Sequence, residues 1–160
     1  MSDPFVTKNI LKWYDLNKRS LPWRKNVSKE KRQYNTLISE FMLQQTQVAT
    51  VIPYFNKFVK EIPNIKKLAS VDNKKLIKLW EGLGYYSRAR NLKKAAQSVI
   101  KNFNGVIPDN FDDLKSLSGI GDYTANAILA IAFNKPYIPL DGNVERLSLI
   151  HISEPTRRSY

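Results

Sequence analysis

Glu40 is the residue whose neighbours best suit proton transfer. It lies in the segment Ser39-Glu40-Phe41-Met42-Leu43-Gln44-Gln45-Thr46-Gln47, where apolar residues are followed by three glutamines and a threonine. A carboxyl on a largely apolar helix face loses hydration, which raises its pKa and suits it to act as a general acid near neutral pH. The alternative is a structural carboxylate that caps a helix or pairs with a nearby lysine.

Gly119 and Gly121 punctuate a second segment, Leu117-Ser118-Gly119-Ile120-Gly121-Asp122-Tyr123-Thr124-Ala125. One helix ends here and another begins at once, so backbone amides at a helix N-terminus face outward, where a phosphate oxygen can bind. Small residues also let a nucleic-acid backbone approach closely. A plain turn between two helices is the alternative, but two glycines between amphipathic helices favour a helix-hairpin-helix.

A glycine-punctuated loop at residues 80–90 carries two aromatic residues beside two cations. Tyr85 and Tyr86 follow Gly84, and Arg88 and Arg90 come directly after them. Aromatic wedges beside arginines suit insertion into a base stack and contact with phosphates. The two tyrosines could instead be ordinary core residues.

Asp141 and Asn143 stand in a fourth segment, Leu140-Asp141-Gly142-Asn143-Val144, which opens a last helix. Polar residues at such a place are often N-caps.

The composition limits the chemistry that an active site of this chain could use, because the sequence has no cysteine and a single histidine, His151. Thiolate metal sites, disulfides and a cysteine nucleophile are excluded, and we expect no metal site. Catalysis must use carboxylates, Tyr, Lys or Ser.

The elements that position these residues are predicted to be helical throughout. Apolar residues recur at intervals of three and four, as in Leu92, Ala95, Ala96 and Val99. Strand-like alternation is missing, so we predict an all-α fold of about eight short helices.

Local signals mark the ends of these predicted helices. Asp72 and Asp109 are expected to be N-caps, and Gly105 is expected to follow a helix that ends near Asn104. Pro53 predicts a kink or an early helix start, and the polar residues 24–33 are expected to form a surface loop.

The net charge of +12 comes from 26 Lys and Arg against 14 Asp and Glu, with a pI near 9.9. Such a surface favours polyanionic partners, of which nucleic acid is the commonest, although a Lys-rich and Asn-rich proteome gives the same bias. No apolar run approaches the roughly 18 residues of a membrane span, and no secretory signal is evident. We therefore expect a cytoplasmic protein, associated with the nucleoid through DNA, with no membrane contact.

Taken together, these segments resemble the helix-hairpin-helix DNA glycosylase superfamily, and within it the adenine DNA glycosylases. The resemblance runs from about Ile10 to Leu147. Its motifs are Leu21-Pro22-Trp23-Arg24, the stretch from Glu40 through Val51-Ile52-Pro53-Tyr54-Phe55, Gly82-Leu83-Gly84-Tyr85-Tyr86 and Leu140-Asp141-Gly142-Asn143-Val144.

The resemblance implies a mechanism in which adenine is flipped out of the duplex and released. Glu40 would protonate adenine N7, and the ionised Asp141 would stabilise the oxocarbenium-like sugar, with help from Tyr123 and Asn143. In related enzymes that also cut the backbone, a lysine stands at the position of Tyr123 and forms a Schiff base, which a phenol cannot do. We expect base excision without a strong lyase step.

The resemblance also implies a DNA interface and an adenine pocket. Gln45 and Tyr85 would be wedges beside the lesion pair, and the pocket would lie near Leu21, Trp23 and Arg24. The expected DNA-binding residues are Gln44, Gln45, Thr46, Tyr85, Arg88, Arg90, Gly119, Gly121 and Thr124. The partner would be double-stranded DNA with adenine opposite 8-oxoguanine or guanine, bound by a monomer.

The sequence departs from the family pattern after residue 148. Full-length relatives continue with four cysteines that hold a 4Fe-4S cluster and with a second domain, whereas this chain has no cysteine and is expected to hold no cofactor. We interpret residues 1–148 as an incomplete, truncated catalytic domain and residues 149–160 as a non-native tail. The alternatives are a thymine mismatch glycosylase of the same fold and an inactive DNA-binding remnant.

Overall fold

The computed structural model describes residues 4–140, Gly142 and Arg146. Every regular element in these residues is helical, which confirms the predicted all-α class. Asp141, Asn143, His151 and the expected tail at residues 149–160 lie outside the described residues. The elements in chain order are α1 (Pro4–Asn17), the 3-10 helix η1 (Pro22–Arg24), α2 (Lys29–Leu43), α3 (Val48–Glu61), α4 (Ile65–Ser70), α5 (Asn73–Trp80), α6 (Ser87–Asn102), α7 (Phe111–Lys115) and α8 (Asp122–Phe133).

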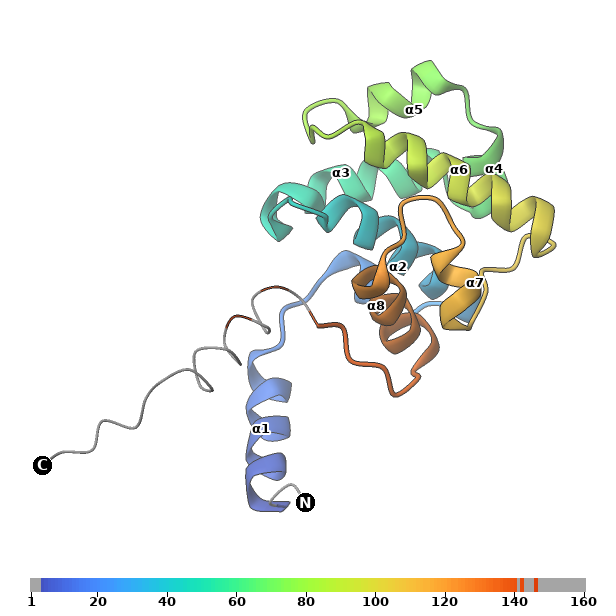
Figure 1. Ribbon diagram of the computed structural model, residues 1–160. Coiled ribbons are helices and arrows are strands. Elements are labelled where there is room, and N and C mark those ends of the chain that lie inside the picture. Colours follow the sequence, from blue (N-terminus) through green and yellow to red (C-terminus); the bar gives the residue numbers. More distant parts are fainter. Residues whose placement is uncertain (1–3, 141, 143–145, 147–160) are drawn as a thin grey trace, which may run out of the picture.

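Helix α2 is the centre of the fold. It packs against η1, α3, α6 and α8, and Figure 1 shows it between α3 and α8. Its residues from Gln33 to Met42 are all buried, because neighbours cover it on every side. Bulky side chains fill the core around it, including Phe58, which meets Trp80 edge to face with ring centroids 6.1 Å apart. The helix that carries Glu40 is therefore held rigidly.

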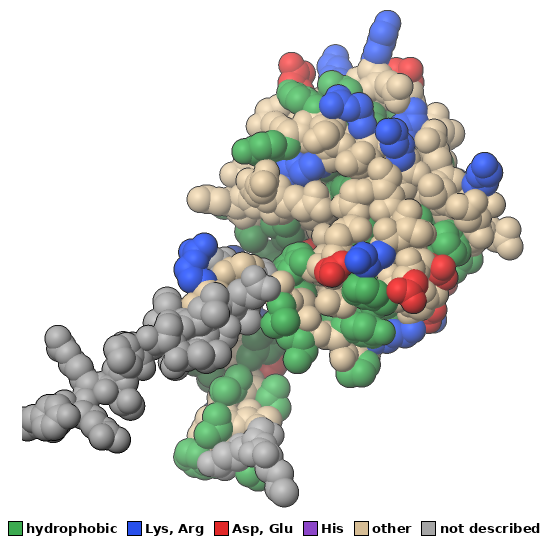
Figure 2. Space-filling view, in the orientation of Figure 1, with side chains coloured by type: hydrophobic (Ala, Val, Ile, Leu, Met, Phe, Trp, Pro, Cys, Tyr) green, Lys and Arg blue, Asp and Glu red, His purple; other side chains and the backbone are tan. Residues whose placement is uncertain are grey.

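Helix α1 stands apart from the body of the molecule (Figure 1), and it has no buried residue. Its large apolar side chains are exposed, and Figure 2 shows green side chains along this helix. They are Phe5, Val6, Ile10, Leu11, Trp13, Tyr14 and Leu16. None of the described helices combines the length and the hydrophobicity that a membrane span requires.

The predicted helix ends are partly confirmed. The Asp72 carboxylate accepts hydrogen bonds from the amides of Lys74 and Lys75, as an N-cap does. Helix α6 ends at Asn102, and Gly105 follows with φ +80°, donating its amide to the Val99 carbonyl over 3.0 Å. Helix α3 runs from Val48 to Glu61 with Pro53 inside it.

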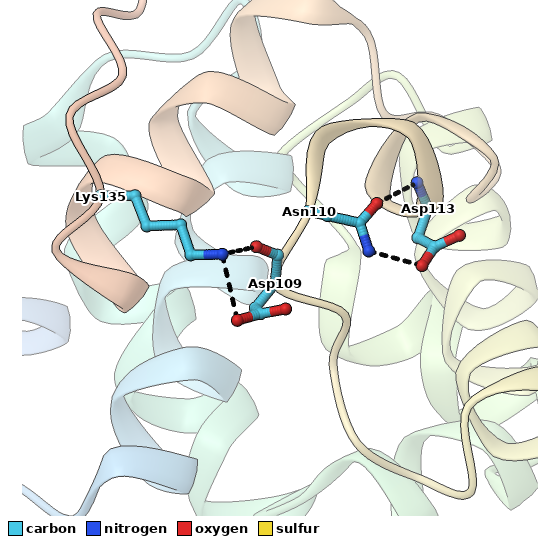
Figure 3. Close-up of polar contacts among 4 residues, drawn as sticks. All are labelled: Asp109, Asn110, Asp113 and Lys135. Carbon is cyan, nitrogen blue, oxygen red and sulfur yellow. Dashed lines mark hydrogen bonds and ion pairs between the residues drawn. The ribbon is translucent and has the colours of Figure 1, made fainter.

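The prediction for Asp109 was wrong, since Asn110 caps α7 instead (Figure 3). The Asn110 Oδ1 accepts from the Asp113 amide at 2.9 Å, and its Nδ2 donates to the Asp113 carboxylate at 2.6 Å. Asp109 forms an ion pair with Lys135 over 3.1 Å, and its carbonyl accepts from the same ammonium. Either residue type can cap a helix; here α7 begins at Phe111, so Asn110 is the capping residue and Asp109 pairs with Lys135.

The expected surface loop at residues 24–33 is shorter than predicted. Helix α2 already begins at Lys29, because the Ser28 hydroxyl accepts from the Lys31 amide and caps it. Gln33 is buried within the helix. Only residues 25–28 connect η1 to α2.

Candidate active site

A cleft of about 1030 Å³ opens beside the C-terminal half of α2. Its walls come from segments distant in the sequence: the η1 region, the end of α2, the loop before α6, and α8. The structure therefore brings together most of the predicted site residues in one cavity. Those that line it are Leu21, Trp23, Arg24, Glu40, Gln44, Gln45, Thr46, Tyr85, Arg88 and Tyr123.

Glu40 lines this cleft from a nearly enclosed position. Its exposed fraction is 7%, and burial raises its pKa to about 7, while the positive charge of Arg24 acts in the opposite direction. The predicted direction of this pKa change is confirmed. Its cause is that α2 is covered on all sides, so the carboxyl gives up water without gaining a strong counter-charge. Such a group can hold a proton at neutral pH and transfer it.

One wall of the cleft is apolar. Pro22 at the start of η1 turns the chain so that Leu21 and Trp23 are both buried, and Trp23 packs edge to face on Phe55 with centroids 5.3 Å apart. Arg24 is exposed on the rim. A flat apolar wall beside a proton donor is suited to an aromatic heterocycle.

Two side chains protrude at the rim on strained backbone. Gln45 has φ +58° and Tyr85 has φ +47°, a region that residues other than glycine rarely adopt. Tyr85 has an exposed fraction of 61%. Strain of this kind persists where the surrounding structure imposes it, and it concentrates at functional sites.

The turn between α7 and α8 passes directly against α2 and α6. Gly119 has φ +83°, and a Cβ placed there would lie 2.8 Å from the Asn91 Cβ and 2.9 Å from the Phe41 ring. Gln44 joins the same turn to α2 by donating to the Gly119 carbonyl at 3.3 Å and to the Thr124 hydroxyl at 3.4 Å. The hairpin is therefore fixed relative to Glu40, the neighbour of Phe41.

Thr124 follows Tyr123 on the first turn of α8. Its side chain is buried, with an exposed fraction of 4%, and it accepts the bond from Gln44. The hydroxyl thus faces α2, and DNA binding at this position stays a prediction that concerns the backbone amides of the first turn of α8. Gly121 is the N-cap residue of α8 and has no side chain that could accept a hydrogen bond. The backbone amides in the first turn of α8 therefore receive no acceptor from their N-cap residue.

Tyr123 lies on the first turn of α8 and lines the cleft with an exposed fraction of 44%. Beside it, Asp122 forms an ion pair with Lys115 over 2.5 Å. No lysine is among the described residues that line the cleft.

Arg19 is a cleft residue that the sequence reasoning missed. The only available signal was a Lys18-Arg19 pair two residues before Leu21. Pro139 also lines the cleft, so the described chain reaches it two residues before Asp141. Asp141 and Asn143 themselves lie outside the described residues.

A family model described as HhH-GPD superfamily base excision DNA repair protein matches residues 38–158. The chain belongs to the HhH-GPD superfamily. Several relatives carry the name adenine DNA glycosylase. The protein of Rattus norvegicus is 46% identical over 88% of this chain and 28% of its own length. The protein of Buchnera aphidicola subsp. Acyrthosiphon pisum is 47% identical over 92% of this chain and 41% of its own length.

Solved structures show the same superfamily fold. A thermostable thymine-DNA glycosylase aligns with a TM-score of 0.78 and 26% identity, over 89% of this chain and 64% of that protein. An endonuclease III bound to DNA aligns with a TM-score of 0.72 and 23% identity, which supports the fold alone. The chain spans less than half the length of the two adenine DNA glycosylases above.

The residues of this HhH-GPD chain do not fit an iron–sulfur cluster. The cluster needs thiolate ligands, and the sequence contains no cysteine. Within the described part of the chain, no three His, Asp or Glu residues are grouped closely enough to hold a metal ion.

Arg88 and Arg90 differ in exposure to solvent in this HhH-GPD fold. Arg90 is exposed, as a phosphate contact requires. Arg88 has an exposed fraction of 6%, and its guanidinium donates to backbone carbonyls at the end of α2 and in the loop before α6. Both Nη atoms of Arg88 donate inside the protein, and its Nε is buried without a hydrogen-bond partner, so this side chain presents little of itself to a phosphate.

Proposed function

We propose that this chain is the catalytic part of an adenine DNA glycosylase, which hydrolyses the N-glycosidic bond of adenine opposite 8-oxoguanine or guanine. The observation that carries the proposal is Glu40, a buried carboxyl with a pKa of about 7 beside an apolar wall in a large cleft. The relatives named adenine DNA glycosylase support the choice of base.

Protonation of the base is the first chemical step. The flipped adenine would stack near Trp23, and Glu40 would donate its proton to N7. The bond between C1′ and N9 then breaks, and its electron pair stays on the adenine, which leaves as a neutral base. Water adds to C1′ and gives a proton to the Glu40 carboxylate, so the sugar ends as a hydroxyl-bearing abasic site and the acid is restored.

Asp141 is proposed to stabilise the positive charge on the sugar in its ionised form, with Asn143 and Tyr123 assisting. Two carboxyls thus have opposite tasks, one protonated and one ionised. Tyr123 faces the cleft and no described lysine lines it, which supports hydrolysis of the base without a Schiff-base step.

The proposed partner is double-stranded DNA. Arg19, Arg24 and Arg90 are exposed cations, the first two on the cleft itself, and the net charge of +12 favours a polyanion. Gln45 and Tyr85 are the proposed wedges, because they protrude at the rim. We also propose that the chain binds DNA as a monomer.

The decisive test is adenine release from a duplex with adenine opposite 8-oxoguanine, followed by alkaline cleavage at the abasic site. The unmodified chain should release adenine, and Glu40→Gln should lose the activity. Glu30→Gln is the matched control, since it makes the same chemical change at an exposed position on the same helix. Strand cleavage before alkali that borohydride traps would contradict the absence of a lyase step.

The same assay with a G·T duplex tests the second candidate, a thymine glycosylase, which the structural similarity to the thymine-DNA glycosylase favours. Thymine release without adenine release would establish it. Salt-sensitive DNA binding by a folded chain, with no base release and no effect of Glu40→Gln, would favour a DNA-binding remnant.

A further inference from the structure

Arg88 is a buried cation whose partners are almost all backbone carbonyls. Within the described residues it forms no ion pair with a carboxylate. Its Nη1 donates to the carbonyls of Phe41 at 3.3 Å, Met42 at 2.8 Å and Gln44, and its Nη2 donates to those of Leu83 and Gly84, each at 3.2 Å. The rings of Trp80 and Tyr85 lie 5.6 Å and 5.5 Å from its guanidinium carbon.

The carbonyls of Phe41, Met42 and Gln44 explain why a cation is stable at this position. Helix α2 ends at Leu43, so its last carbonyls lack partners within the helix and form the negative end of its dipole. A planar guanidinium with several fixed donors can satisfy them together, which a lysine ammonium cannot do in the same way. Arg88 thus caps the helix of Glu40 from another helix.

The carbonyls of Leu83 and Gly84 belong to the loop before α6. Gly84 directly precedes Tyr85, and Gln44 directly precedes Gln45. One guanidinium therefore binds the carbonyls immediately before both rim residues that have positive φ. No other described side chain has hydrogen bonds to both segments.

We infer that Arg88 is a positioning residue that sets the separation of Gln45 and Tyr85, so that the two enter a duplex together and the displaced base arrives over Glu40. The inference rests on the proposed glycosylase function. It gives Arg88 no contact with DNA and no part in proton transfer. Its loss should impair opening of the duplex much more than the chemical step.

The test compares two substrates under single-turnover conditions with enzyme in excess. One carries adenine paired with 8-oxoguanine in a duplex, and the other carries adenine in a single-nucleotide bulge, where little unstacking is needed. For Arg88→Met we expect the rate on the paired substrate to fall about 100-fold, because unstacking costs a few kcal/mol and each 1.4 kcal/mol is a factor of ten. On the bulge we expect a fall of less than about threefold.

Arg88→Lys and Lys94→Met complete the set of variants. Arg88→Lys keeps the charge but not the planar fork, so its rate on the paired substrate should lie between those of Arg88→Met and the unmodified chain. Lys94→Met removes one positive charge from an exposed site on the same helix and should leave both rates unchanged. Full recovery in Arg88→Lys would overturn the inference, since charge alone would then suffice.

Two further measurements separate positioning from general damage to the fold. If the core around α2 were disturbed, Glu40 would gain water and the alkaline midpoint of the rate on the bulge would shift downward. We expect it to stay unchanged in Arg88→Lys. We also expect the effect of Arg88→Lys to shrink when Gln45→Ala and Tyr85→Ala are already present, because residues that act together are not additive. Equal losses on both substrates would overturn the inference.

Fluorescence of 2-aminopurine at the adenine position makes the test independent of catalysis. The unmodified chain should raise the fluorescence of the duplex on binding, and Arg88→Lys should bind with similar affinity but give a smaller rise. If no base is released from any substrate, the proposed function fails, while a lost rise in Arg88→Lys still supports the positioning role. An unchanged rise, or none from the unmodified chain, would overturn it.

Discussion

Glu40→Gln tests the site through protein stability, without reference to any substrate. The Glu40 carboxyl has a pKa of about 7 in the folded chain against an ordinary value of 4.5, and it is the only buried carboxyl among the described residues. Each pKa unit corresponds to about 1.4 kcal/mol, so the difference between these two values is worth about 3 kcal/mol. Glutamine has nearly the same shape and carries no charge at any pH.

The sign of the effect follows from which state holds the proton. Below pH 4.5 the carboxyl is protonated in both states and the charge contributes nothing. Between pH 4.5 and about 7 the folded state keeps the proton that the unfolded state has lost, so the stability of the unmodified chain falls as the pH rises. Above pH 7 the loss is complete. Glu40→Gln should therefore gain about 3 kcal/mol relative to the unmodified chain between pH 4.5 and 8.

Urea unfolding at a series of pH values, followed by circular dichroism, measures this difference. Glu30→Gln is again the control, since it makes the same chemical change at an exposed position on the same helix. Unfolding free energies of Glu40→Gln and the unmodified chain that run parallel from pH 4.5 to 8 would refute the reasoning. In the adenine-release assay the same group predicts a rate that falls about tenfold per pH unit above pH 7.

Other changes test the supports of the site. Gly119→Ala should destabilise the chain by about 2 kcal/mol or more in urea unfolding, because φ is +83° and the new Cβ meets two neighbours, whereas Gly121→Ala, with open space, should have little effect. Asp72→Ala removes two capping bonds and should cost about 1 kcal/mol in the same measurement; an unchanged midpoint would contradict the cap. Arg24→Met removes a charge that lowers the pKa of Glu40, so the stability titration of that carboxyl should move to higher pH rather than lower.

The direction of the Glu40 pKa change could be predicted from the sequence, although its extent depends on the elements that cover α2 on all sides. Apolar neighbours on one helix imply desolvation, and desolvation alone determines the direction of the pKa change. The all-α class followed in the same way from apolar spacing, since a helical period leaves a strand no consistent face. The Asp72 cap needed only the residues that follow it.

Arg88 and Arg90 show what the local sequence pattern could not predict. Two residues apart on a helix lie about 200° apart around its axis, so they face opposite ways, but the sequence does not say which of them faces the core. Packing of α6 against α2 turned Arg88 inward to the carbonyls and left Arg90 outside. The hydrogen bond from Gln44 to Thr124 and the ion pair between Lys135 and Asp109 are likewise contacts between distant segments that local pattern does not reveal.

The sequence by itself therefore determined the helices, the basic surface and the chemical types available to the site. Tertiary structure alone decided which polar groups face the cleft and which form hydrogen bonds inside the protein. This choice depends on contacts between segments more than 40 residues apart, such as Gln44 with Gly119 and Arg88 with Met42. Residue type limits what a side chain can do, and its neighbours in space select among those possibilities.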